Sequence, residues 1–227
     1  KYFNFFVNTM SEIYSWLHLV YPVQSMKIIL PIGLSFHTFQ SLSYVIEVYR
    51  GKQKPEKNFG IYSLYVMFYP QLVAGPIERP QNLLHQFREK HDFDYNKITN
   101  GLKLMIWGLF KKVVIADRIA MIVNNVYNHP SEFQGLAFII STVLFAIQIY
   151  CDFSGYSDIA IGSAQVMGFK LMDNFNRPYF SKSISEFWKR WHMSLSRWFK
   201  DYLYISLGGN RVPKWRWQFN LFFTFLI

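Results

Sequence analysis

The sequence predicts an all-α fold, a polytopic bundle of membrane helices with broken or re-entrant segments and amphipathic helices at the membrane interface. Three features of the sequence indicate this fold. The first two are the hydrophobic and aromatic contents, 51% and 20% of the 227 residues, since aromatic side chains are favoured where a protein meets a bilayer. The third is the spacing of the charged residues, which leaves long uncharged runs between short basic segments.

The first uncharged run, residues 28–46, is about 19 residues long and suffices to cross roughly 30 Å of hydrocarbon as a helix. Pro31 and Gly33 fall in its first turns, where proline is tolerated. His37 and Gln40 are polar within the run, and we expect both to hydrogen-bond inside the bundle, because buried polar groups usually have partners. The basic residues that follow predict that this end faces the cytoplasm. They are Arg50, Lys52, Lys54 and Lys57.

The second uncharged run, residues 58–77, leads into the sequence FYPQLVAGPIERP at 68–80. Proline and glycine there interrupt a continuous helix, and irregular backbone at membrane depth is tolerated only where protein or a water-filled cavity surrounds it. This predicts a broken or re-entrant segment rather than a simple span. Glu78 and Arg79 at its polar end are interpreted either as the lining of a cavity or as an interfacial ion pair.

Residues 88–100 are polar and predict a loop. Residues 101–127 have apolar residues on both sides of their charges, and two interpretations stay open. They form either an amphipathic helix in the interface with snorkelling lysines or a short span with a charged end. Residues 128–131 predict a turn, and residues 133–151 form the clearest predicted span, because charges lie only at the flanking positions 132 and 152.

Two carboxylates, Asp152 and Asp158, follow this span directly. A charge near a bilayer interior is expensive and usually faces a cavity or a partner. We therefore interpret the pair either as structural groups bonded to backbone or to arginine side chains at a helix junction, or as groups that line a substrate path. The glycines that would let neighbouring helices approach closely, if the helix continues, are Gly155, Gly162 and Gly168.

A helix is predicted from Ser183 to about Leu203, because Ser183 and Glu186 have the spacing of a capping box. Its pattern is strongly amphipathic. The apolar face carries Trp188, His192, Leu195 and Phe199, flanked by Trp191, Trp198 and Tyr202. Another side carries Lys189, Arg190, Arg197 and Lys200. A turn is predicted at 207–211, and Trp215 and Trp217 are expected to anchor the start of a further span.

The formal net charge of +10 is compatible with nucleic acid or with the anionic cytoplasmic face of a membrane as partner. Between Arg177 and Arg216, nine Lys or Arg stand against two acids, with aromatic residues among them. The flanking apolar spans favour the headgroup level of a membrane over single-stranded nucleic acid. Cys151 is the sole cysteine, which excludes an internal disulfide framework and predicts a small core residue.

Five motifs resemble the membrane-bound O-acyltransferase family, with its alginate O-acetyltransferase branch of polysaccharide acetylases nearest. They are LPIGLSF at 30–36, FYPQLVAGPIERP at 68–80, DFSGYSDIAIG at 152–162, NFNRPY at 174–179 and EFWKRWHMSLSRWFKDYLYISLGGNR at 186–211. The run around His192 is specific, whereas LPIGLSF alone is weak. The match covers essentially the whole chain, and we interpret residues 1–227 as part of one membrane domain of this family, with both flanks outside the sequence.

The resemblance implies an enzyme that moves an acetyl or other acyl group from a thioester donor on the cytoplasmic side, acetyl-coenzyme A, to hydroxyls of an exported polysaccharide or a relay protein. It implies two functional polar positions across a tunnel: His192, and a catalytic histidine in the following span, which the chain does not include. The second histidine is expected to act as base, while His192 orients the acyl carbonyl or the hydroxyl.

The resemblance and the residue patterns together suggest further residues that line or support the tunnel. They are Asp152, Tyr156, Asp158, Trp188, Arg190, Trp191, Arg197, Asp201, Asn210 and Pro76. Arg190 and Arg197 are interpreted either as contacts for the donor's phosphates or as interfacial anchors. We predict no metal site and no permanently bound cofactor.

The resemblance also implies a multi-pass protein of the bacterial inner membrane, whose partners are the lipid bilayer and an exported polysaccharide or a periplasmic acetyltransferase relay protein, with no nucleic acid. Three alternatives stay open. One is a D-alanyl-type transferase for teichoic acid, although the LGGNR turn favours the acetylase branch. The second is a proton-coupled transporter in which Asp152, Asp158 and His192 relay protons. The third is a soluble basic nucleic-acid binder, which high salt would release.

Overall fold

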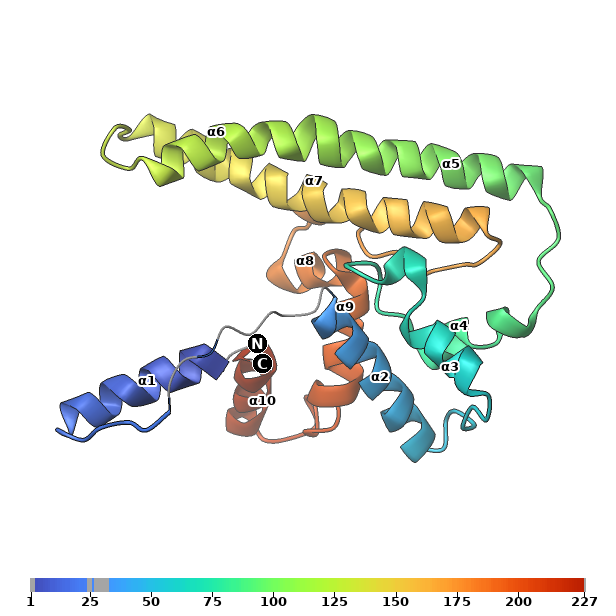
Figure 1. Ribbon diagram of the computed structural model, residues 1–227, viewed down its shortest axis with the longest axis horizontal. Coiled ribbons are helices and arrows are strands. Elements are labelled where there is room, and N and C mark those ends of the chain that lie inside the picture. The colour runs from blue at the N-terminus through green and yellow to red at the C-terminus, as the bar shows by residue number, and fades with distance from the viewer. Residues whose placement is uncertain (1–2, 24–25, 27–32, 227) are drawn as a thin grey trace. The chain divides into compact units, whose positions relative to one another are not determined.

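The computed structural model describes residues 3–23, 26 and 33–226, and within these ranges every regular element is a helix, as predicted (Figure 1). The chain divides into two units, residues 1–34 and 35–227. In the first unit, α1 (Phe3–Trp16) is followed by a segment that returns to it. There the side-chain amide of Asn4 donates to the Met26 carbonyl at 2.8 Å and accepts from the Met26 N–H at 3.0 Å.

The second unit contains the remaining elements, apart from the first residue of α2, Leu34, which belongs to the first unit. They are α2 (Leu34–Tyr49), α3 (Phe59–Val66), the 3₁₀ turn η1 (Tyr69–Gln71), α4 (Pro80–Leu83), η2 (Gln86–Arg88), α5 (Tyr95–Leu109), the π-helical η3 (Phe110–Ala116), α6 (Asp117–Asn128), α7 (Leu136–Val166), η4 (Pro178–Phe180), α8 (Ile184–Arg190), α9 (Met193–Trp198), the π-helical η5 (Phe199–Tyr204) and α10 (Lys214–Leu226).

A long helical hairpin dominates the second unit. The elements α5, η3 and α6 run without a break along α7, which returns antiparallel to them (Figure 1). The run begins earlier than predicted, because the Asp94 carboxylate caps it by accepting from the N–H groups of Asn96 and Lys97 at 3.0 and 3.1 Å. The loop predicted for 88–100 therefore ends at Asp94. Residues 101–127 lie along α7 and are not an isolated helix.

Glycines set the spacing of this hairpin. A Cβ atom at Gly108 would lie 2.5 Å from the Gly155 carbonyl oxygen, and one at Gly101 would lie 2.7 Å from that of Gly162. The prediction that Gly155 and Gly162 permit close helix contact is confirmed. For Gly168 it is wrong: that residue follows the end of α7 in a left-handed conformation, with φ +92°.

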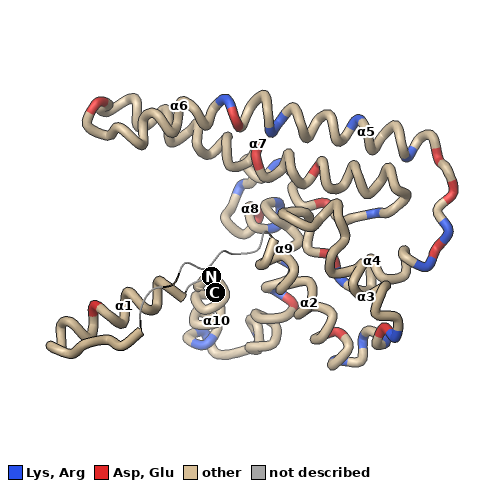
Figure 2. Tube along the Cα trace, viewed as in Figure 1, with Lys and Arg blue, Asp and Glu red and all other residues tan. Residues whose placement is uncertain are grey.

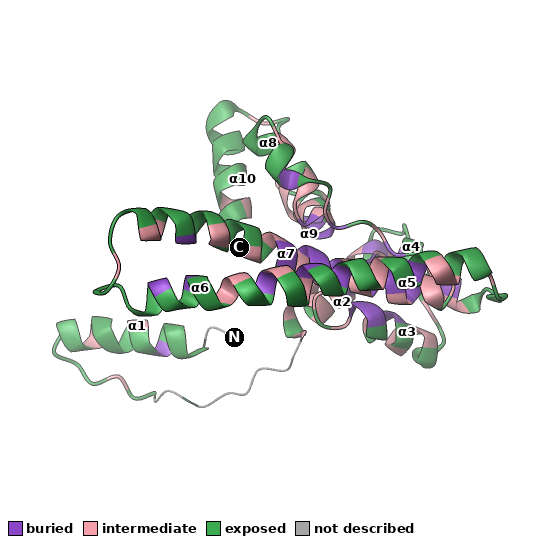
Figure 3. Cartoon of the chain, turned by 90° about the horizontal axis from the view of Figure 1, so that it is seen from above, coloured by how far each residue is buried: buried purple, intermediate pink, exposed green. Residues whose placement is uncertain are grey.

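The predicted span at 133–151 is confirmed as a helix, which begins at Leu136 and continues past both carboxylates to Val166. Among the described residues, α7 alone is long and apolar enough to cross a membrane, and an 18-residue window within it has a mean hydropathy of 1.9. Only 11% of this window is buried within the structure, so this part of α7 does not resemble the core helix of a soluble protein (Figure 3). The other predicted spans, and thus the multi-pass bundle, are not confirmed.

Before the hairpin, the chain is helical in short pieces. The described part of the first predicted span is α2, with 16 residues, and Pro31 lies outside the described residues. The polar residues of α2 are bonded as expected, since Gln40 Nε2 donates to the Tyr65 carbonyl at 2.5 Å and His37 Nδ1 lies 3.2 Å from the Val66 carbonyl oxygen. The break predicted for 68–80 is confirmed, because only η1 is helical between α3 and α4.

The C-terminal part departs most from the prediction. The Ser183 hydroxyl caps α8 by accepting from the Glu186 N–H at 3.1 Å, as predicted. The helix expected to continue to Leu203 instead ends at Arg190 and restarts at Met193. The common face expected for Trp188 and His192 therefore does not exist. The turn at 207–211 is confirmed, with Gly208 and Gly209 at positive φ.

Candidate functional site

His192 occupies the break between α8 and α9 in a left-handed conformation, with φ 42° and ψ 54°. Two backbone hydrogen bonds hold the break in place. The Asn176 N–H donates to the Arg190 carbonyl, and the Met193 N–H donates to the Asn174 carbonyl, both at 2.9 Å. The segment NFN at 174–176 thus forms hydrogen bonds with the Arg190 carbonyl and the Met193 N–H, which a continuous helix would have paired internally.

Asn174 fixes this arrangement from within the protein, where it is fully buried. Its Nδ2 donates to the Ser157 hydroxyl of α7 at 3.2 Å. Its Oδ1 accepts from the Ser194 N–H at 3.2 Å and from the Ser194 hydroxyl at 2.9 Å. The interpretation of the sequence missed Asn174, although it lies in the NFNRPY motif. This side chain links α7 to the first turn of α9, directly after His192.

The His192 imidazole lies among aromatic rings and is only 5% exposed. Its ring centroid is 4.6 Å from that of Phe153 and 6.3 and 6.4 Å from those of Phe36 and Phe175. Nδ1 is buried and has no hydrogen-bond partner among the described residues. Burial lowers the pKa of His192 to about 4, because the low-dielectric surroundings disfavour the cation. At neutral pH the ring is therefore an uncharged hydrogen-bonding group.

The broken segment 68–80 carries two buried polar side chains, Gln71 and Glu78. The Glu78 carboxylate accepts from the Met172 N–H and, at 3.3 Å, from the Asn82 side chain. Burial raises the pKa of Glu78 above its ordinary value. Pro76 is fully buried. The interpretation of Glu78 and Arg79 as an ion pair is wrong, since Arg79 is paired elsewhere.

Arg79 forms an ion pair with Asp201 of η5. The guanidinium groups of Arg79 and Arg50 lie 5.3 and 5.4 Å from the ring centroid of Tyr202, and Arg50 also donates to the Ser206 hydroxyl at 2.8 Å. These contacts fasten η5 to α2 and to the broken segment. Asp201 is thus a supporting residue of the fold.

Both carboxylates of α7 are paired with lysines of η3. Figure 2 marks the positions of basic and acidic residues along the chain. Asp158 lies 2.7 Å from Lys111 Nζ, which also donates to the Ser154 hydroxyl at 3.0 Å. Asp152 lies 2.7 Å from Lys112 Nζ. These contacts favour the structural interpretation of the two carboxylates, with lysines in place of the expected arginines. Lys111, a buried lysine, was not among the predicted site residues.

The remaining predicted residues are dispersed. Trp191 stacks on Phe187 with a centroid distance of 5.6 Å, next to His192 in the chain, whereas Trp188 contacts Phe225 of α10 at 5.6 Å. Arg190 pairs with Glu186 at 2.6 Å. The Tyr156 hydroxyl interacts with the backbone at 73–74. Arg197 and Asn210 are exposed.

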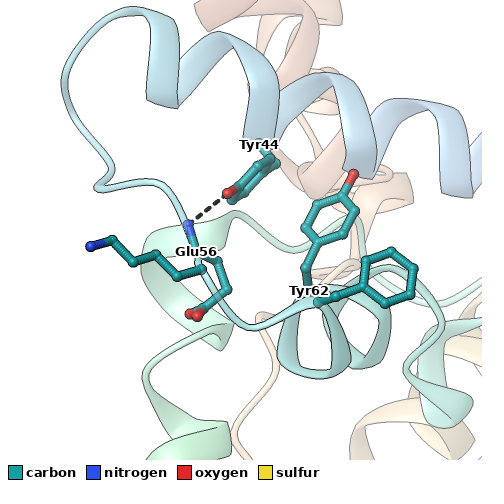
Figure 4. A pocket seen from close by; sticks show the side chains of 5 residues that line it. Tyr44, Glu56 and Tyr62 are labelled. Atoms are coloured by element: carbon teal, nitrogen blue, oxygen red, sulfur yellow. Dashed lines mark hydrogen bonds between the residues drawn. The ribbon is translucent and has the colours of Figure 1, made fainter.

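One surface pocket of the described part of the chain does not include these residues. It has a volume of about 360 Å³ and lies where the end of α2 faces the start of α3 (Figure 4). Its lining residues are Tyr44, Glu56, Lys57, Phe59 and Tyr62. The Tyr44 hydroxyl accepts from the Glu56 N–H at 2.7 Å across it. In the residues that the structure describes, no three His, Cys, Asp or Glu side chains are grouped to hold a metal ion.

Comparison with known proteins gives a consistent result. The sequence profile of the membrane-bound O-acyltransferase family matches residues 58–227. The protein named "Probable alginate O-acetylase AlgI" of Pseudomonas aeruginosa is 44% identical over 228 residues, which cover 100% of this chain and 43% of that protein. A peptidoglycan O-acetyltransferase of Helicobacter pylori is 36% identical over 253 residues, covering 100% and 47%.

A third relative, a teichoic acid D-alanyltransferase of Streptococcus thermophilus, is 30% identical over 182 residues, which cover 78% of this chain and 44% of that protein. The chain thus spans a little less than half the length of each of these curated relatives.

Proposed function

The chain belongs to the membrane-bound O-acyltransferase family, and from this premise we propose that its full-length protein transfers an acetyl group from a cytoplasmic thioester, acetyl-coenzyme A, to hydroxyls of an exported polysaccharide. Residues 1–227 are then part of its membrane domain in the bacterial inner membrane. A periplasmic relay protein is a further proposed acceptor. The similarity to proteins named as O-acetylases, over the whole chain, supports this assignment.

The proposed step is an acyl transfer. The hydroxyl oxygen attacks the thioester carbonyl carbon, a C–O bond forms and the C–S bond breaks. The hydroxyl proton passes through a base to the leaving sulfur, so the products are an ester and a free thiol. The developing oxyanion requires hydrogen-bond donors in a site that excludes water.

His192 is proposed to orient the reacting groups and not to act as the general base. Its lowered pKa makes it a weak base, because a useful base has a pKa near the working pH. A neutral imidazole can donate one hydrogen bond and accept another. The observation that carries this proposal is a buried imidazole whose Nδ1 has no partner among the described residues, on a backbone held in the left-handed region. The general base is assigned to a histidine outside these 227 residues.

Two variants in the full-length protein test this role. Asn tolerates a left-handed backbone better than Ala, so His192→Asn separates loss of the imidazole from backbone strain, whereas His192→Ala combines the two effects. Both should reduce the acetyl-ester content of the exported polymer at least about tenfold, within the range of a lost positioned catalytic group. The protein should remain in the membrane.

The matched control is His129→Asn, which replaces an exposed histidine at the end of the hairpin. It should leave the ester content unchanged. Unchanged ester content in both His192 variants would refute the role of His192. Release of D-alanine instead of acetate on alkaline hydrolysis would favour the teichoic acid type of activity, for which one relative is named.

A further inference from the structure

Gln71 is a buried polar residue whose side chain has no partner in the described part of the chain. It ends η1, directly after Pro70, and is only 3% exposed. Neither its Nε2 nor its Oε1 forms a hydrogen bond within the described residues, and both atoms are shielded from solvent. Gln71 therefore presents both a donor and an acceptor without a partner in the part of the chain that the structure describes.

Other buried glutamines behave differently. Gln86 Nε2 donates to the carbonyls of Asn82 and Lys170 at 2.6 and 3.0 Å, and its Oε1 accepts from the Lys170 N–H at 2.8 Å. Gln40 donates to the Tyr65 carbonyl. A buried polar group without a partner is destabilising, and native proteins rarely retain one without a reason. The amide of Gln71 thus calls for a partner that the described residues do not supply.

The position of Gln71 relates it to His192 through α7. The η1 turn packs against α7, and two residues beyond Gln71 the backbone at 73–74 contacts the Tyr156 hydroxyl. Phe153 lies one turn before Tyr156 on the same face of α7, and its ring is the nearest aromatic contact of His192. The η1 turn that ends in Gln71 and the ring of His192 therefore both contact α7, from two different segments of the chain.

We propose that Gln71 is a substrate-binding residue of the acyl-transfer site, with Nε2 donating to the carbonyl oxygen of the acyl thioester and Oε1 accepting from the attacking hydroxyl. This inference rests on the proposed function. The ligand needs one acceptor and one donor, and an acyl carbonyl next to a hydroxyl offers this pair. His192 and Gln71 then hold the reacting groups from two sides of one stretch of α7.

The experiment compares variants of two buried glutamines in the full-length protein. Gln71→Met keeps a side chain of similar length and removes both polar atoms. It should lower kcat/KM for acetyl transfer from acetyl-coenzyme A about tenfold or more, the size expected for one lost hydrogen bond to a reacting group. Gln71→Met should leave the thermal unfolding temperature unchanged or raise it, because it removes an unpaired buried amide.

Gln86→Met is the matched control, because it removes a buried amide that is fully paired. It should lower the unfolding temperature and leave kcat/KM per folded protein unchanged. If Gln71→Met retains kcat/KM within twofold, the amide does not bind the reacting groups and the proposal fails.

Different results would refute the proposed function and the proposed role of Gln71. If the unmodified full-length protein forms no acetyl ester, the proposed function fails. If it forms the ester and the His192 variants are impaired, but Gln71→Met retains kcat/KM within twofold, only the inference about Gln71 fails.

Discussion

A left-handed backbone at a residue other than glycine is uncommon and is usually imposed by its surroundings. At His192 the surroundings are identifiable: the Asn174–Asn176 segment binds the backbone on both sides of the break, and Asn174 also binds Ser194. The imidazole is thereby held among three Phe rings. A single residue thus combines a constrained backbone, burial and an unsatisfied ring nitrogen.

The lowered pKa of His192 predicts a pH-dependent contribution to stability. The unfolded chain binds a proton below about pH 6.5, whereas the folded chain binds it only near pH 4. The unfolded state therefore holds more protons in this window, and the free energy of unfolding falls as the pH falls through it. The loss attributable to His192 should reach up to about 3 kcal/mol at pH 4.

Thermal unfolding in detergent between pH 4 and 7.5 measures this effect as the difference between the unmodified chain and His192→Asn. A difference is required because Glu78, whose pKa is raised by burial, changes stability in the opposite direction over part of the same window. Identical pH profiles for the two proteins would contradict the prediction.

At the scale of the element, the α5–α7 hairpin combines close packing with paired charges. Glycines bring the backbones together at two levels, Gly101 with Gly162 and Gly108 with Gly155. Shortly after Gly108, the π-helical η3 carries two consecutive lysines that pair with the α7 carboxylates. A π-helical turn changes the direction of successive side chains relative to an α-helix. The ion pairs therefore fix the register of the hairpin.

The buried pair of Lys111 and Asp158 gives a test at this scale. Lys111→Met should destabilise the protein by about 3 kcal/mol, because it leaves a carboxylate without its partner. The double variant Lys111→Met with Asp158→Leu should recover most of this loss. Chemical denaturation in mild detergent measures both effects. A double variant as unstable as the single variant, yet folded, would contradict the structural interpretation of this pair.

At the scale of the whole molecule, apolar surface and positive charge coexist. Large hydrophobic side chains are exposed along the hairpin, including Ile106, Trp107, Ile139 and Val143, while the chain carries a formal charge of +10. In water such a surface would drive association. A bilayer accommodates both features, because its interior covers the exposed apolar side chains and its anionic face attracts the Lys and Arg side chains.

Extraction from cell membranes tests this view. Washing with 1 M salt screens electrostatic attachment, since the Debye length is then about 3 Å, but the protein should remain in the pellet. Detergent should release it. Release by salt alone would indicate peripheral attachment or nucleic-acid binding.

Much of the architecture was predictable because it depends on local patterns. The helical class follows from the spacing of apolar and charged residues, the break at 68–80 from proline and glycine, the start of α8 from Ser183, and the close hairpin from Gly155 and Gly162. Each of these acts within a few residues of the chain or through the absence of a side chain, so no knowledge of distant partners is needed.

The sequence by itself therefore determined the helical character of this protein and the motifs that relate it to its family, and it singled out His192. Only the tertiary structure decided that the helix breaks at His192 and that lysines neutralise Asp152 and Asp158. It also decided that Asn174 is paired, whereas the Gln71 amide has no partner among the described residues. The physical reason is that a hydrogen bond or ion pair depends on which groups meet in space. The partners here are distant in sequence: 43 residues separate Lys111 from Ser154, and 17 separate Asn174 from Ser157.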